Sequence, residues 1–193
     1  MTKTSENFMP TPDEAATLLR ERRTINKFKP TPPPHELIEQ AVEVARWAPN
    51  HRMTQPWRFY LLGEQSKQKI IDLNADLVLA KKGEAAAKVK RKRWEAVPGW
   101  LVVTCKRSED PLQAQEDYAA CCCAVHNLTL FLWSHGVGCK WTTGAVTRDP
   151  RFYQSLDIDA QAEELVGLLW YGYPDQSPRT KRKPVEDILF TRD

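Results

Sequence analysis

The sequence has no long hydrophobic run and little glycine, with 8 Gly against 14 Pro in 193 residues. No stretch reaches the roughly 18 apolar residues of a membrane span, and the N-terminus, with Glu6 and no long apolar core, does not resemble a signal peptide. We therefore expect a cytoplasmic protein in a reducing compartment. Hydrophobic residues make up 41% of the chain, which predicts a globular domain with a buried core rather than a disordered protein.

Metal-binding patterns are also absent from the sequence. The five Cys form no C-x-x-C pair, and the four His lack the i, i+4 spacing of a helical zinc site. Three Cys are consecutive, from Cys121 to Cys123, in a stretch that is otherwise apolar. We interpret them as small buried hydrophobic residues, and we expect no metal site.

Charge is only weakly informative, because the net charge of +3 is spread along the chain. One dense basic run extends from Lys88 to Arg93 and is followed by Trp94. Such runs are usually a solvated helix face. The alternative is a nucleic-acid binder that uses the run for phosphates and Trp94 for base stacking, but no nucleic-acid fold motif supports it.

Periodicity and end signals predict an α+β fold in one domain, residues 1–193, with helices covering both faces of a sheet. The first helix begins at the Thr11-Pro12-Asp13-Glu14 signal and extends to about Arg23. The proline-rich stretch 29–34 is expected to be extended. We expect further helices at 35–47, 66–80, 117–135 and 150–156, and strands at 57–62, 100–105, 139–143 and 165–171.

The expected helix at 117–135 is apolar almost all round. A single small sheet cannot cover so much apolar surface, so we expect an obligate homodimer.

Three segments carry residues suited to binding. The first, Arg20 to Thr24, ends the first helix, and its guanidinium groups either cap the helix carbonyls or bind phosphate together with the Thr24 hydroxyl. The second is the stiff loop 48–57, which has a proline near each end and contains His51. The third, 136–144, has glycines and paired threonines that allow close approach of a planar ligand, but it lacks the P-loop and dinucleotide spacings.

Together these segments resemble the nitroreductase family of flavin mononucleotide (FMN) enzymes. The resemblance rests on "RERRTINKF", "ARWAPNHRMTQPWRFYLL", "GVGCKWTTGA", "LVGLLWYGYP" and "KRKPVEDIL", and it is closest to the short bacterial NAD(P)H nitroreductases. It implies a nitroreductase-like fold, with a central, mostly antiparallel sheet, helices on both faces and an intertwined homodimer that holds FMN at the subunit interface.

The resemblance also implies roles for individual residues. Arg22, Arg23 and Thr24 would hold the flavin phosphate and ribityl chain or the neighbouring ring edge. Trp47 and His51 would contact the flavin from the second segment, and Trp141, Thr142 and Thr143 from the third. Arg182 in the tail would reach the phosphate. The nicotinamide nucleotide would contact Ser134, His135 and Gly136.

The implied function is that of an oxidoreductase which passes reducing equivalents from NADH or NADPH to nitroaromatic, quinone or related acceptors by a ping-pong flavin mechanism. No catalytic side chain is implied, because the flavin carries the chemistry. The alternative is a non-catalytic flavin-binding or storage protein of the same fold. The basic segment from Ala85 to Trp100 is interpreted as a flap over the flavin pocket.

Two residues depart from the family pattern. Many family members have Asn where this chain has Met53, which cannot donate a comparable hydrogen bond to the isoalloxazine; His51 is a possible substitute donor. Many have Lys or Arg where this chain has Asn26, so less positive charge is expected near the flavin, although Lys27 is adjacent.

Overall fold

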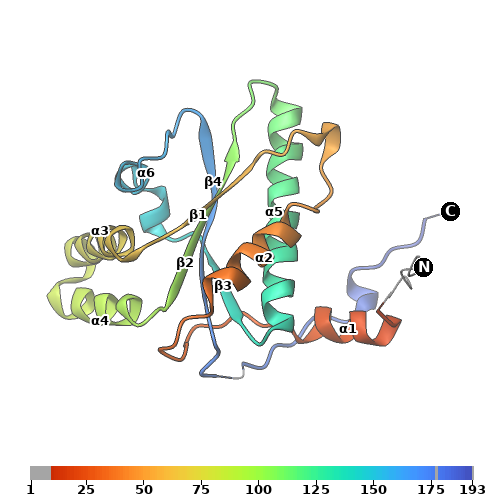
Figure 1. Ribbon diagram of the computed structural model, residues 1–193, viewed down its shortest axis with the longest axis horizontal. Coiled ribbons are helices and arrows are strands. Elements are labelled where there is room, and N and C mark those ends of the chain that lie inside the picture. The colour runs from red at the N-terminus through yellow and green to blue at the C-terminus, as the bar shows by residue number, and fades with distance from the viewer. Residues whose placement is uncertain (1–9, 177, 193) are drawn as a thin grey trace, which may run out of the picture.

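The computed structural model describes residues 10–176 and 178–192, and its centre is a four-stranded sheet with the order β1-β2-β4-β3 (Figure 1). The strands are β1 (Trp57–Leu61), β2 (Gly99–Lys106), β3 (Gly138–Thr142) and β4 (Glu163–Gly172). Every neighbouring pair is antiparallel, which confirms the expected antiparallel sheet. In the β2–β4 pairing the register shifts between Val103 and Thr104, and Val166 is left without a partner.

Helices cover both faces of this sheet. They are α1 (Pro12–Glu21), α2 (His35–Ala45), α3 (Glu64–Lys82), α4 (Glu84–Glu95), α5 (Pro111–Ser134) and α6 (Pro150–Ser155), with short 3-10 turns η1 (His51–Met53), η2 (Ala145–Arg148) and η3 (Val185–Asp187). Figure 1 shows α3, α4 and α6 on one side of the sheet and α2 and α5 on the other. The predicted α+β arrangement is confirmed.

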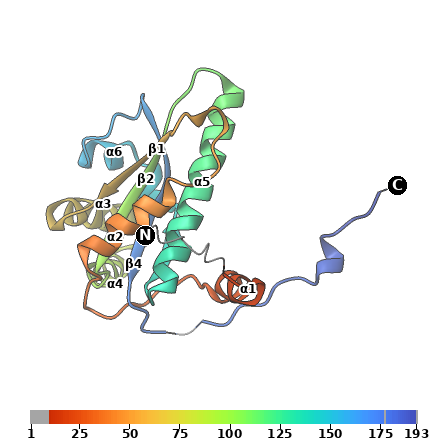
Figure 2. The ribbon, with the colours of Figure 1, turned by 45° about the vertical axis from the view of Figure 1, so that its right-hand side comes forward.

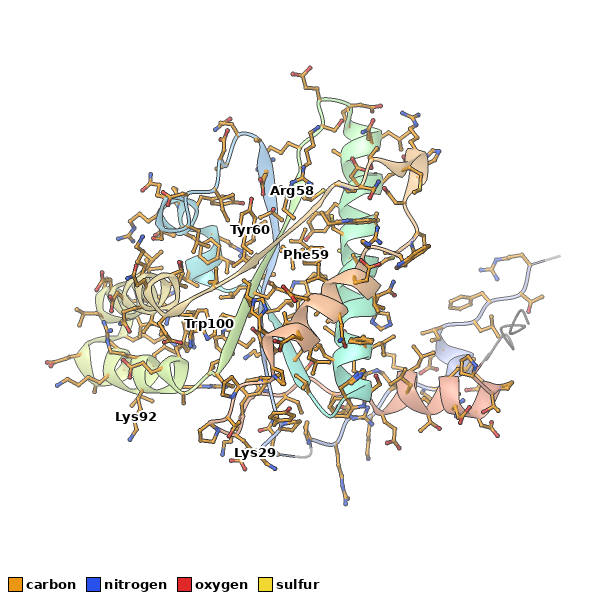
Figure 3. The ribbon with its side chains drawn as sticks, viewed as in Figure 1. Lys29, Arg58, Phe59, Tyr60, Lys92 and Trp100 are labelled. Carbon is orange, nitrogen blue, oxygen red and sulfur yellow. The ribbon has the colours of Figure 1, made fainter. Side chains whose placement is uncertain are left out.

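Two hydrophobic cores follow from the alternation of side chains along the central strands. Leu101 and Val103 of β2 face α5, where they join Leu128 in one core. Trp100 and Val102 point the other way, into a core with α3, and Figure 3 shows Trp100 on that side. The sheet is therefore buried on both faces.

End signals explain where the first and the longest helices begin. Thr11 forms the expected capping box with Glu14 at the start of α1. The long helix α5 begins at Pro111, six residues earlier than predicted, because the Asp110 carboxylate caps it by accepting from the backbone N–H of Leu112 at 3.0 Å. The first turns of α5 are rich in polar residues, so the apolar pattern of the sequence did not reveal that the helix begins at Pro111.

The run of three cysteines only partly matches its prediction. Cys121 is buried, Cys122 is half-buried and Cys123 is exposed, because consecutive residues on a helix point in different directions. The interpretation as buried hydrophobic residues is thus correct for Cys121 and wrong for Cys123.

Both ends of the described chain lie on the α5 side of the molecule. Figure 2 shows α1 beside the C-terminal end of α5 and the segment after β4 running away from the body. Among the described residues, no helix combines the length and apolar character needed to span a membrane, and no group of three or more His, Cys, Asp or Glu could hold a metal ion.

Candidate functional site

The segment after α1 lies along the free edge of the sheet, beside β3. Thr24 forms a parallel bridge with Cys139, and the N–H of Ile25 donates to the Cys139 carbonyl at 3.0 Å. The Ile25 side chain is completely buried and anchors this pairing. The sheet edge therefore brings the Arg-Arg-Thr segment next to the strand that ends in Trp141 and Thr142.

Arg23 makes the hydrogen bonds of a helix cap. Its Nη1 donates to the Arg22 carbonyl at 3.0 Å and also to the Arg20 carbonyl. The helix-capping role of this arginine is thus observed, but it uses only one of the guanidinium nitrogens. The remaining donors of this half-buried side chain are available to an anion.

A cavity of about 510 Å³ opens beside Arg23. Its lining combines the end of α1, the end of α5 and the segment after β4, and consists of Glu21, Arg23, Trp133, Gly136, Pro174, Gln176 and Pro178. The volume is within the range of cofactor sites. Arg23 and Gly136, which come from two of the predicted binding segments, meet in this cavity.

A second cavity of about 450 Å³ lies along the segment that follows α1, and it shares Gln176 with the first cavity. It is lined by Asn26 and Lys27 together with Arg93 from α4. Asp175 also lines this cavity, so two cations lie beside one acid, and the effect expected from Asn26 on the charge near the flavin stays a prediction.

The Trp141 side chain is held against the sheet by a hydrogen bond and is still partly exposed. Its Nε1 donates to the Val166 carbonyl at 3.0 Å, and its ring lies over Gly167, where a Cβ would approach the indole nitrogen to 2.0 Å. The side chain is still 39% exposed. Thr142 and Thr143 follow at the end of β3, half-buried and exposed respectively.

The thiol of Cys139 lies on β3 where Thr24 and Ile25 pair with the strand. Burial raises its pKa to about 12, an effect that the nearby Arg22 only partly offsets. The thiol therefore stays protonated at neutral pH and is not an activated nucleophile.

The predicted nicotinamide contacts form the end of α5. Ser134 Oγ donates to the Phe131 carbonyl at 2.7 Å, and His135 Nδ1 lies 2.9 Å from the same oxygen. Gly136 has a φ of +74°, the left-handed conformation of a glycine that ends a helix. Ser134 and His135 are thus engaged in capping, whereas Gly136 lines the first cavity.

The loop that carries His51 is fixed to the N-terminal half of α5. His51 Nδ1 lies 2.8 Å from Glu116 Oε2, and Thr54 Oγ1 donates to the buried Asp117 carboxylate. Inside the loop, Asn50 Oδ1 accepts from the Gln55 N–H at 2.6 Å. These contacts give the loop one defined shape.

The same loop holds an unusual backbone. Arg52, Met53 and Gln55 have φ values of +59°, +51° and +46°, a left-handed region that costs non-glycine residues energy. Met53 is 71% exposed and Trp47, just before the loop, is 74% exposed. Strained backbone with exposed large side chains is typical of a binding loop rather than of a simple connection.

Within one chain, the structure joins two of the three predicted segments and leaves the third apart. The first and third meet at β3, near the C-terminal end of α5, whereas Figures 1 and 2 show the η1 loop near its N-terminal end. Within one chain, the η1 loop therefore lies apart from the sheet edge where the first and third segments meet. Arg182 lies in the exposed tail, where Nη1 donates to the Lys181 carbonyl at 3.4 Å.

The segment from Ala85 to Trp100 is a packed part of the fold rather than a loose loop, and its Arg93 lines the second cavity, so its role as a cover of the flavin pocket stays a prediction. Its residues form α4 and the start of β2, and Trp94 and Trp100 are 4% and 0% exposed in the core. A buried Trp94 also cannot stack on a base, which removes the aromatic half of the nucleic-acid alternative. The basic run is a helix face, as expected, with Lys88 and Lys92 exposed.

Sequence reasoning missed several residues of the site. Arg93 and Gln176 line cavities, and Glu116 and Asp117 anchor the loop. Asp117 carried a usable signal, since an acid that opens an apolar helix and is buried needs a partner. The others depend on contacts between distant parts of the chain.

Comparison with known proteins identifies relatives of this chain. Residues 19–173 match the model of the Nitroreductase family. The chain is 33% identical over 177 residues to the Bacillus subtilis (strain 168) protein named "Putative NAD(P)H nitroreductase YfhC", covering 88% of this chain and 90% of that protein.

Solved structures share the fold. The nitroreductase-like family protein from Bacillus cereus has a TM-score of 0.84 and 29% identity, covering 96% of this chain and 100% of that one. The FMN and NADPH-dependent nitroreductase NfnB from Sphigopyxis sp. strain HMH has a TM-score of 0.73 and 16% identity, covering 93% and 99%.

Proposed function

Because the chain belongs to the nitroreductase family, we propose that it is an FMN-dependent oxidoreductase, which takes reducing equivalents from NADH or NADPH and passes them to nitroaromatic, quinone or related acceptors. The observation that carries this proposal is the meeting of the Arg-Arg-Thr segment with β3 beside a cavity of about 510 Å³. The relative NfnB is named for FMN and NADPH, which supports the same cofactor and donor here.

The residues at this edge fit the chemistry of FMN. A phosphate needs cations and hydrogen-bond donors, and Arg22, Arg23 and the Thr24 hydroxyl supply both. The flavin ring system needs an aromatic or apolar wall, and the exposed part of Trp141 provides one. When bound, FMN supplies the hydride-accepting and hydride-donating chemistry.

The protein's own part is binding and orientation. Arg22 and Arg23 hold the phosphate, and the Thr142 and Thr143 hydroxyls offer polar contacts at the end of β3. Lys27 and Arg93 place positive charge along the second cavity, which Asp175 also lines. The two cations stabilise negative charge that develops on a bound ligand during reduction. Donor and acceptor use the same pocket in turn.

We further propose that the working unit is a homodimer built on α5. One side of this helix faces the core. A second side carries a stripe of residues that are half-buried or exposed, and successive residues of the stripe are separated by four and three positions in turn. The stripe consists of Leu112, Glu116, Ala119, Cys123, His126, Leu130 and Trp133. Five of the seven are apolar, as expected for a helix that packs against a partner.

A two-fold axis across α5 would complete the site. The helix is about 36 Å long, and packing two copies in opposite directions sets the N-terminal half of one beside the C-terminal half of the other. The His51 loop of one protomer would then lie near the Arg23 cavity of its partner. The exposed apolar tail residues Ile188, Leu189 and Phe190, each at least 66% exposed, would also be covered by the second chain.

The function is tested on protein stripped of flavin and then mixed with FMN. We expect the protein to bind FMN and NADH or NADPH to bleach the visible flavin absorbance without oxygen, after which a nitroaromatic or quinone restores it. Failure to bind FMN would refute the proposal. Binding without bleaching by either nucleotide would instead support the flavin-storage alternative.

A further inference from the structure

A separate cavity of about 290 Å³ lies between α3, α4 and the sheet, on the face opposite α5. It is lined by four lysines from three elements: Lys81 and Lys82 of α3, Lys90 of α4 and Lys140 of β3. We call it the lysine cavity. No acidic side chain contributes to its lining.

The four ammonium groups are not neutralised within the described part of the chain. No carboxylate lies within 4.0 Å of any of them, although neighbours such as Lys67 and Lys88 do form ion pairs. Burial lowers the pKa of Lys140, and the charges of Arg93 and Lys90 lower it further. Burial likewise lowers the pKa of Lys90, with additional repulsion from Arg93 and Lys82. Positive charge is concentrated here without a protein counter-charge.

Three residues that line the cavity also carry buried polar atoms. The side-chain nitrogens of Asn74, Trp94 and Trp170 have no partner among the described residues, and these residues are only 7%, 4% and 2% exposed. Because the nitrogen atoms themselves are covered by protein, they do not face a ligand in the cavity. The polar recognition that the cavity offers therefore comes from the four lysines.

The walls add an aromatic and apolar component. Trp94 and Trp170 meet edge to face, with ring centroids 5.0 Å apart, and Lys140 Nζ lies 5.0 Å from the Trp170 ring. Leu77 and Val146 complete the apolar surface. The two indoles are only 4% and 2% exposed, so they offer little surface for stacking, and a ligand that fits the cavity is small and carries negative charge.

We propose that the lysine cavity binds a small dicarboxylate. One carboxylate pairs with Lys90 and Lys140, and the other pairs with Lys81 or Lys82. This site does not depend on flavin chemistry. It shares Thr142 with the proposed flavin contacts, so the two sites have one wall in common.

The test uses terephthalate, a benzene ring with two carboxylates, and terephthalamide as a neutral probe of similar shape. Binding is measured by calorimetry and by tryptophan fluorescence on the full chain, with and without FMN. We expect terephthalate to bind in both states and terephthalamide to bind at least about tenfold more weakly, the loss expected when a charge-assisted hydrogen bond is removed.

Lys140→Met is the decisive variant, with Lys88→Met as its control. Methionine keeps the length and packing of the side chain, and Lys88 is an exposed lysine paired with Glu84. Lys140→Met should lose at least about tenfold in terephthalate affinity, and Lys88→Met should match the unchanged protein. Thermal unfolding confirms that both variants are folded.

Three results would overturn the proposal. They are no binding of terephthalate, equal affinity in the two variants, or displacement of terephthalate by FMN. The last result would assign the cavity to the flavin site. Since these readouts need no reduction of flavin, they stay separate from the test of the proposed function.

Discussion

The indole Nε1 of Trp141 donates to the carbonyl of Val166 at 3.0 Å, and Val166 is the residue that the β2–β4 pairing leaves out. The hydrogen bond thus satisfies a carbonyl beside a register shift in the sheet. It also fixes the indole ring, which is 39% exposed and which we propose as a wall of the flavin site. Trp141 therefore couples the stability of the sheet edge to the shape of the site.

Replacing Trp141 with Phe keeps an aromatic ring but removes the donor. We expect the free energy of unfolding to fall by about 1 kcal/mol, the usual contribution of such a bond, while FMN binding persists. Urea unfolding and flavin titration measure the two effects. Loss of FMN binding with unchanged stability would show that the indole N–H serves the cofactor and not the sheet.

Gly167→Ala should disturb the same ring sterically. A Cβ at this position would meet Trp141 atoms at 2.0 and 2.4 Å, so the indole has to move. We expect a loss of stability of about 1–3 kcal/mol, as for other overpacked sites. Gly63→Ala is the control, because a Cβ there meets nothing within 4 Å. Equal melting temperatures for the two variants would contradict the close contact.

Arg23→Ala should weaken FMN binding by about 10- to 100-fold, because a charged hydrogen bond contributes about 1.5–3 kcal/mol. Stability should change little, since α1 has no buried residue. Arg20→Ala is the matched control, because Arg20 is a nearby arginine in the last turn of α1 that does not line the cavity. If the two variants bind FMN equally well, Arg23 is only a helix cap.

Ala119→Arg tests the proposed dimer. Ala119 is exposed in the single chain, so the substitution should not affect the fold of one protomer, but it adds a charge to the α5 stripe. We expect a folded monomer with strongly reduced FMN content. Analytical ultracentrifugation measures the mass, and Lys92→Glu on exposed α4 serves as control. A dimer that retains FMN would place the interface elsewhere.

Tyr171 gives a prediction for alkaline pH. Burial raises its pKa to about 12 from an ordinary value of 10.0. Its contribution to stability is complete below pH 10 and is lost as pH rises toward 12, because the unfolded chain ionises first. Between about pH 9 and about pH 11 the protein should lose about 1 kcal/mol that Tyr171→Phe does not lose. Parallel losses in both proteins would contradict this.

Local signals in the sequence predicted most of the fold. The β-branched residues of β2, the capping box of Thr11 and Glu14, and the apolar run within α5 are each local signals, and all three elements appear in the structure. The start of α5 was placed too late because its first turns are polar on the surface. Whether a residue such as Cys123 is buried depends on its helix face, which three consecutive cysteines do not reveal.

The candidate site was predicted only in part, because it depends on long-range contacts. The motifs identified Arg23, Thr24 and Trp141, but not that Thr24 pairs with Cys139 along the sheet edge. Arg93 was seen only as part of a charge run, although it lines a cavity with Asn26. The distance between the His51 loop and Arg23 within one chain follows from the length of α5, and only the three-dimensional arrangement shows it.

The central claim is that this chain binds FMN and exchanges reducing equivalents through it. Anaerobic mixing of FMN-loaded protein with NADH or NADPH tests it most directly, by following the visible flavin absorbance. We predict complete bleaching by at least one nucleotide and full recovery when a quinone is added. Absorbance that stays constant with both nucleotides, in protein shown to hold FMN, would contradict the account.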